Sequence, residues 1–88
     1  MITYMRDDLL KIYNHFGKEP QLSQWYEEAV ELLDAIDNGN KSDVLNEMAD
    51  NCVMAFQHYM TDAKLRAKVD EKIKRTLERI KSGYYEVS

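Results

Sequence analysis

Residues 25 to 33 read Trp25-Tyr26-Glu27-Glu28-Ala29-Val30-Glu31-Leu32-Leu33, a pattern typical of a helix with one acidic edge. At about 100° per residue, Glu28 and Glu31 share one narrow stripe of the helix surface. Trp25 and Leu32 border that stripe from the apolar side. The segment therefore predicts an amphipathic helix that carries two carboxylates beside its core face.

The next helix is expected to carry a matching stripe, with Glu47, Asp50 and Asn51 on one side. Glu28 and Glu31 precede the turn at Gly39 by about as many residues as Glu47 and Asp50 follow it. In an antiparallel hairpin the four carboxylates would therefore lie at one level. The hairpin geometry predicts that they converge.

Hydrophobic periodicity predicts four helices, over roughly residues 4–16, 21–37, 42–61 and 63–82, and no strand. Gly17 and Pro20 separate the first pair, and Asn38-Gly39 ends the second helix. Ser42 is the expected N-cap of the third helix, and Gly83 is expected to stop the fourth. We expect an all-α fold in a single domain over residues 1–88, of the four-helix-bundle type.

Apolar residues cover more than half the circumference of the third helix, which therefore needs burial on two sides. Four short helices cannot surround it in one chain. We expect a homo-oligomer, a dimer or a dimer of dimers, in which hairpins from two chains complete the bundle. Cys52 lies within the apolar arc, so the sequence predicts a buried and inert thiol.

The net charge of −4 argues against some partners. Residues 1–61 carry 11 acidic and 4 basic side chains, whereas residues 62–88 carry 5 and 8. An acidic chain is a poor candidate for duplex nucleic acid, because that affinity depends on neutralising phosphates. No apolar stretch is long enough for a membrane span, and the lone cysteine fits a reducing compartment, so we expect a cytoplasmic protein.

Four clustered carboxylates repel one another, and a divalent cation would relieve that repulsion. Mg²⁺ fits best as a hard ion that prefers oxygen ligands, with Mn²⁺ as an alternative. It would bridge phosphate oxygens and lower the pKa of an attacking water. The simpler interpretation is a pair of solvated helix faces, since Glu-x-x-Glu is common in acidic helices.

The run from Trp25 to Leu33, followed by Glu47-Met48-Ala49-Asp50, resembles the EExxE…ExxD signature of the MazG and dimeric dUTPase superfamily. The ending Glu71-Lys72-Ile73-Lys74-Arg75-Thr76-Leu77-Glu78-Arg79-Ile80, then Gly83-Tyr84-Tyr85, also resembles compact MazG-like proteins of phages and bacteria. This resemblance implies a pyrophosphohydrolase that cleaves a nucleoside triphosphate between the α and β phosphates. It also implies that Glu28, Glu31, Glu47 and Asp50 hold the metal and act in catalysis.

Other residues are candidates for substrate binding. Lys72 and Arg75 fall on one stripe of the fourth helix and would hold phosphates, unless that face is merely solvated. Asn51 would orient a metal ligand or a sugar hydroxyl. Trp25 would stack on a nucleobase or pack in the core. His58 is too far along its helix from Asp50 to join the same metal shell, and we expect it to be structural.

The leading hypothesis is Mg²⁺-dependent hydrolysis of a nucleoside triphosphate to a monophosphate and pyrophosphate, for house-cleaning or control of the nucleotide pool. Two alternatives stay open at this point. One is a nucleotide-binding regulator without catalysis, and the other is a small acidic helical interaction protein whose carboxylates are solvated.

Overall fold

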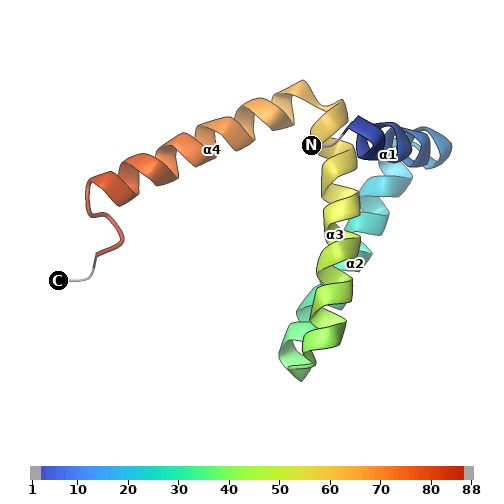
Figure 1. Cartoon of the computed structure of the whole chain (residues 1–88), viewed down its shortest axis with the longest axis horizontal. Coiled ribbons are helices and arrows are strands. Elements are labelled where there is room, and N and C mark those ends of the chain that lie inside the picture. The colour runs from blue at the N-terminus through green and yellow to red at the C-terminus, as the bar shows by residue number, and fades with distance from the viewer. Residues whose placement is uncertain (1–2, 87–88) are drawn as a thin grey trace.

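The structure is a computed structural model that describes residues 3–86, with side chains from residue 5 onward. Four helices follow one another along this part of the chain (Figure 1), namely α1 (Thr3–Phe16), α2 (Lys18–Asn38), α3 (Lys41–Thr61) and α4 (Ala63–Lys81). Residues 3–86 contain no strand, which confirms the all-α class. None of these helices combines the length and hydropathy needed to cross a bilayer.

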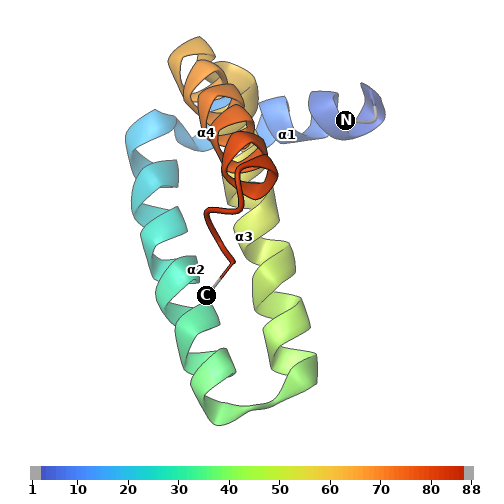
Figure 2. The ribbon, with the colours of Figure 1, turned by 90° about the vertical axis from the view of Figure 1, so that its left-hand side faces the viewer.

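The α2–α3 hairpin is the largest packed unit, and two residues shape its turn (Figure 2). Gly39 takes a left-handed conformation at φ 70°, and its N–H donates to the carbonyls of Ala35 and Ile36. The Oδ1 of Asn40 accepts from the N–H groups of Ser42 and Asp43 at 3.1 and 3.2 Å. Asn40 is therefore the N-cap of α3, and the prediction of Ser42 was wrong by two residues.

Helix α1 lies across the end of the hairpin that is remote from the Gly39 turn (Figure 1). Gly17, at φ 93°, makes the sharp connection from α1 into α2, and its N–H donates to the Tyr13 carbonyl. Leu9 of α1 is buried, and α1 contacts both helices of the hairpin. This end of the hairpin is thus closed, while its long faces stay open.

A single residue connects α3 to α4. Asp62 ends α3 and also caps α4, where its Oδ1 accepts from the N–H groups of Lys64 and Leu65 at 2.9 and 3.1 Å. So short a connection cannot reverse the chain, and α4 leaves the hairpin at a steep angle (Figure 1). Within residues 3–86, α4 packs on α3 alone.

Little of the apolar surface is buried in one chain. Leu9, Ala35 and Met54 are the buried apolar residues of the described part. The radius of gyration is 16.0 Å, whereas a globular chain of this length has about 12 Å. Cys52 is exposed, so the prediction of a buried thiol was wrong for the single chain. The reason is that α3 packs along one side only.

Candidate metal centre

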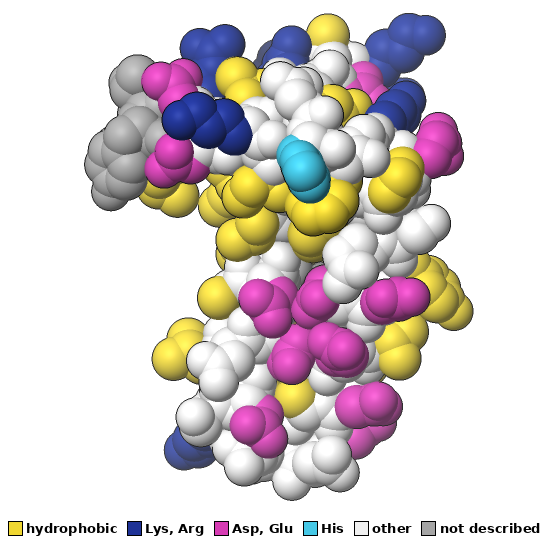
Figure 3. Space-filling view, turned by 90° about the vertical axis from the view of Figure 1, so that its right-hand side faces the viewer, with side chains coloured by type: hydrophobic (Ala, Val, Ile, Leu, Met, Phe, Trp, Pro, Cys, Tyr) yellow, Lys and Arg dark blue, Asp and Glu magenta, His cyan; other side chains and the backbone are white. Residues whose placement is uncertain are grey.

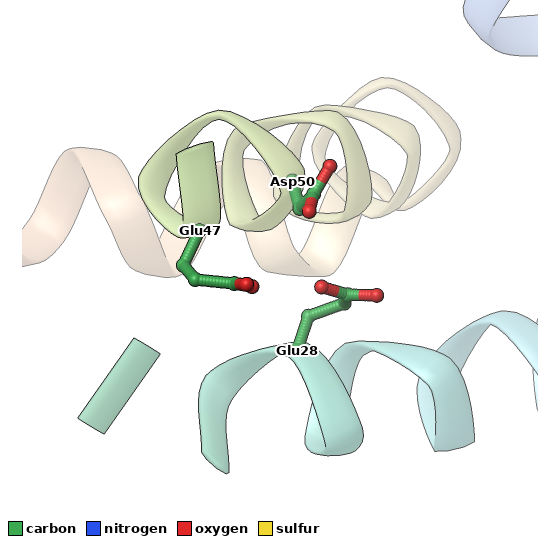
Figure 4. Close-up of side chains that lie close together, drawn as sticks. All are labelled: Glu28, Glu47 and Asp50. Carbon is green, nitrogen blue, oxygen red and sulfur yellow. The ribbon is translucent and has the colours of Figure 1, made fainter. Parts of the chain in front are cut away.

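Three carboxylates converge at mid-length of the hairpin, where α2 supplies Glu28 and α3 supplies Glu47 and Asp50. Figure 4 shows Glu28 and Glu47 pointing toward each other from facing helices, with Asp50 above them. One oxygen from each residue lies within 4.8 Å of the other two. The convergence predicted from the sequence is thus present for these three residues.

Glu28 and Glu47 are half-buried, and the Oε2 atom of each is buried without a hydrogen-bond partner. The other oxygen of Glu28, Oε1, accepts a hydrogen bond from Nε2 of Gln24 at 2.9 Å. A buried carboxylate oxygen without a donor loses its hydration and gains nothing in return. Two facing carboxylates that each have such an oxygen are an arrangement that a cation would stabilise.

Glu31 lies beside this group, on the solvent side. Its pKa is raised above the ordinary value of 4.5, first by the charge of Glu28, then by that of Glu47, and further by desolvation. The raised pKa means that the ionised form of Glu31 is disfavoured by its neighbours. The fourth carboxylate predicted from the sequence is therefore adjacent to the cluster, although it does not share the 4.8 Å grouping.

Acidic side chains gather on one face of the hairpin, the face turned away from the direction in which α4 projects (Figure 3). The ion pairs within residues 3–86 are Lys68 with Glu71 and Lys74 with Asp70, both inside α4. No lysine or arginine of the described chain pairs with Glu28, Glu47 or Asp50. The donor set is all oxygen, which suits Mg²⁺ or Mn²⁺.

Asn51 fixes the spacing between the two helices at the level of the carboxylates. Its Nδ2 donates to the backbone carbonyl of Glu28 at 2.9 Å and to that of Glu47 at 2.8 Å. The same amide nitrogen thus holds the backbones of two carboxylate residues from different helices. Asn51 positions the acidic pair, and its predicted contact with substrate stays a prediction.

A buried pair of amide side chains, Gln21 and Gln57, was not predicted from the sequence, and it lies further from the Gly39 turn than the carboxylates do. Nε2 of Gln21 donates to Oε1 of Gln57 at 2.7 Å, and Gln57 is 0% exposed. Nε2 of Gln57 donates in turn to the carbonyl of Val53 at 3.1 Å. The available signal was the position of Gln57 among apolar residues of the third helix. The pair fixes the register of α2 on α3, on which the convergence of the carboxylates depends.

Trp25 packs in the interior instead of facing the acids. Its ring stacks on that of His58 at 5.4 Å between centroids, and Tyr13 meets the same imidazole edge-on. Trp25 also lines an apolar cavity of about 620 Å³, which no acidic residue lines. Its stacking on a nucleobase stays a prediction. His58, 5% exposed, is packed as a structural residue, as expected.

The predicted phosphate-binding residues Lys72 and Arg75 are not brought to the carboxylates within one chain. Both are exposed on α4, which does not contact α2 and projects from the side opposite the acidic face (Figures 1 and 3). Their predicted role stays a prediction, and it would require the α4 of another chain. One chain therefore brings together the carboxylates of the candidate cation site, but it does not place Lys72 and Arg75 beside them.

No family model, curated protein or solved structure matches this chain. The resemblance to the MazG family therefore rests on the quoted motifs. The four helices between residues 3 and 86 and the cluster of Glu28, Glu47 and Asp50 are compatible with that resemblance.

Proposed function

We propose that this chain is a Mg²⁺-dependent pyrophosphohydrolase of the MazG type, which converts a nucleoside triphosphate to a nucleoside monophosphate and pyrophosphate. The observation that carries the proposal is the pair of buried oxygens on Glu28 and Glu47 that have no hydrogen-bond partner. Asp50 offers a carboxylate oxygen that lies within 4.8 Å of an oxygen from each of these two residues. Such a group of anions is best explained by a cation that belongs there.

Glu28, Glu47 and Asp50 would hold the ion, and Glu31 would join them from the solvent side. A bound Mg²⁺ would neutralise this group, withdraw charge from phosphate oxygens and lower the pKa of water. Mn²⁺ suits the same oxygen ligands. Asn51 donates hydrogen bonds to the backbone carbonyls of Glu28 and Glu47. These bonds would hold the two half-buried carboxylates in a constant orientation.

The exposed carboxylates Asp50 and Glu31 lie where substrate and water would arrive. The neighbours that raise the pKa of Glu31 also make its carboxylate a stronger proton acceptor. Either group would take the proton from a water that attacks phosphorus in line with the pyrophosphate leaving group. The proposal further includes a homo-oligomer and a cytoplasmic protein.

The test is a screen of common and modified nucleoside triphosphates with Mg²⁺, in which pyrophosphate and monophosphate are both measured. We expect pyrophosphate and monophosphate in equal amounts from at least one substrate, and loss of both when EDTA is added. Absence of turnover for every triphosphate, with Mg²⁺ and with Mn²⁺, would overturn the catalytic proposal. Calorimetry on the same set would then reveal a nucleotide-binding regulator.

The extent of exposed apolar surface favours a second candidate, a helical interaction protein. Leu45 is 69% exposed and Leu33 62% exposed on the hairpin, and such residues mark protein interfaces. In that case the carboxylates would be solvated and metal would not matter. The melting temperature separates the two candidates, because an ion that binds only the folded protein must raise it.

A further inference from the structure

A polar cavity of about 350 Å³ lies at the closed end of the hairpin, remote from the Gly39 turn and separate from the carboxylate cluster. It forms where the end of α1, the start of α2, the end of α3 and the start of α4 meet (Figure 1). The polar residues that line it are Tyr13, Lys18, His58, Thr61, Asp62 and Lys64. A ligand in this cavity can therefore contact all four helices.

The charged groups of this cavity leave it positive, in a chain whose net charge is −4. Lys18 and Lys64 line it, and neither forms an ion pair with a carboxylate of the described residues. Asp62 is the one acidic residue of the lining. Its pKa is lowered below the ordinary 3.8, first by the N–H of Leu65, then by the N–H of Lys64 and the charges of both lysines. Two ammonium groups beside one carboxylate attract an anion.

A buried histidine of the same lining lacks a hydrogen-bond partner. His58 is 5% exposed, and its Nε2 is buried without a partner among the described residues. Trp25 stacks flat on the imidazole and Tyr13 meets it edge-on, so neither ring supplies that partner. Leaving a buried nitrogen unpaired costs free energy. A polar ligand beside His58 would supply the missing partner, which is a second reason to regard the cavity as a binding site.

The hydrogen-bonding groups of the cavity indicate which anion it suits. Lys18 and Lys64 can only donate, whereas Thr61 uses its own proton on the carbonyl of Gln57 at 2.8 Å and can still accept. Asp62 caps α4 with Oδ1, so its Oδ2 remains an acceptor outside the cap.

An anion without a proton would therefore meet oxygens that repel it as well as ammonium groups that attract it. An oxyanion that keeps a proton can donate that proton to an acceptor of the cavity while its other oxygens accept from the lysines. At neutral pH a phosphate group keeps a proton in part of its population, whereas sulfate keeps none. The combination of donors and acceptors thus favours phosphate.

We propose that the cavity between Lys18, His58 and Lys64 binds a phosphate group, at a site separate from the carboxylates. The two lysines hold its oxygens, and Asp62 accepts its proton. Within residues 3–86, α4 packs on α3 alone, so a phosphate between Lys18 at the start of α2 and Lys64 near the start of α4 also fixes the angle at which α4 leaves the hairpin. His58 follows Asp50 by about 12 Å along α3, and the site needs no metal.

Calorimetry of the whole chain with inorganic phosphate, without metal, tests the site. Lys18→Gln and Lys64→Gln are each expected to weaken binding by at least ~10-fold, because each removes a charged hydrogen-bond donor. The matched control is Lys41→Gln, since Lys41 is exposed, begins α3 as Lys18 begins α2, and does not line the cavity. It is expected to bind phosphate as the wild type does. A nucleoside monophosphate is titrated in parallel, and tighter binding with the same dependence on both lysines would identify a nucleotide as the source of the phosphate.

Sulfate tests the role of Asp62. Wild-type protein is expected to bind sulfate at least ~10-fold more weakly than phosphate. Asp62→Asn keeps an oxygen that can cap α4 and replaces the other oxygen by an amide donor. This variant is therefore expected to lose the preference for phosphate over sulfate. Equal binding of the two anions by the wild type would overturn the choice of phosphate.

The two histidines give a readout that depends on no variant. In NMR spectra the imidazole signals of His58 are expected to shift as phosphate is added, whereas those of His15, which is exposed and does not line the cavity, are expected to stay constant. Trp25, the one tryptophan of the chain, stacks on His58, so its fluorescence is expected to change as well.

Two results would overturn the proposal. One is an absence of heat and of any His58 shift at millimolar phosphate. The other is binding that Lys18→Gln and Lys64→Gln weaken no more than Lys41→Gln does. Because no metal is present, either result leaves the proposed hydrolase activity untouched, and an inactive enzyme would leave phosphate binding at this cavity untouched.

Discussion

A carboxylate oxygen of Glu28 lies within 4.8 Å of one from Glu47, although the two residues belong to facing helices. Each carboxylate also has a buried oxygen without a hydrogen-bond partner. Packing at this level brings like charges together and partly removes their hydration, both of which disfavour the folded state. A metal ion would turn this cost into a stabilising contact.

The substitution Glu47→Gln separates the metal from the helix packing, because glutamine keeps the shape and the helix propensity of glutamate. Without metal, the free energy of unfolding is expected to stay constant or to rise, since one repelling charge has been removed. With Mg²⁺, the rise in melting temperature seen for the wild type is expected to shrink. Turnover is expected to fall by more than about 100-fold.

The matched control is Glu27→Gln, because Glu27 is exposed and lies off the stripe that carries Glu28. Its melting temperature, Mg²⁺ response and turnover are expected to stay close to wild type, within the ~0.5 kcal/mol typical of surface substitutions. The metal-bearing face is assigned wrongly if Glu27→Gln abolishes turnover while Glu47→Gln leaves it intact.

The pH dependence of stability follows from Glu31. Its pKa is raised in the folded protein above the ordinary value of 4.5, so the folded state binds a proton more tightly than the unfolded state does. This contribution to stability is complete below about pH 4.5 and is lost as the pH rises through the folded pKa. Without metal, the melting temperature is therefore expected to rise as the pH is lowered from neutral toward 4.5.

Two measurements identify Glu31 as the source of that trend. Glu31→Gln is expected to flatten this dependence on pH, because the titrating group is gone. Saturating Mg²⁺ is expected to weaken it in the wild type, because the ion neutralises the charges that raise the pKa. An unchanged pH profile in Glu31→Gln would show that other groups are responsible.

The substitution Asn51→Asp keeps the size of the side chain and removes the donor that holds two carbonyls. The backbone oxygens of Glu28 and Glu47 would then face a carboxylate instead of an amide nitrogen. We expect a loss of about 2 kcal/mol in the free energy of unfolding by urea, from two lost hydrogen bonds. Asn46→Asp, at an exposed position of α3, adds the same charge and is expected to cost much less.

The buried pair Gln21 and Gln57 is suited to a double-mutant cycle. Gln57→Leu alone leaves the amide of Gln21 buried without its 2.7 Å partner, and we expect a cost of about 1 to 3 kcal/mol in unfolding free energy. Adding Gln21→Leu removes the orphaned group, so the double variant is expected to recover much of that loss. Strictly additive single effects would show that the two amides do not act as a pair.

The sequence predicted the helices and their order, because periodicity and capping are local properties. The left-handed turn at Gly39 and the short α3–α4 junction came close to their predicted positions. The N-cap of α3 was predicted at Ser42, whereas it is Asn40. Both residue types are good caps, and the choice between them depends on the residue at which the turn after Gly39 ends.

By itself, the sequence determined that Glu28, Glu47 and Asp50 share one level of a hairpin, because residue spacing around a single turn decides this. Only the tertiary structure decided which atoms lack partners, since that depends on how Asn51 and the pair of Gln21 and Gln57 fix the two helices relative to each other. It also decided that α4 diverges from the hairpin, because a one-residue link prevents reversal. Where Lys72 and Arg75 lie relative to the carboxylates could not be predicted from helix periodicity, which carries no information on where a helix lies.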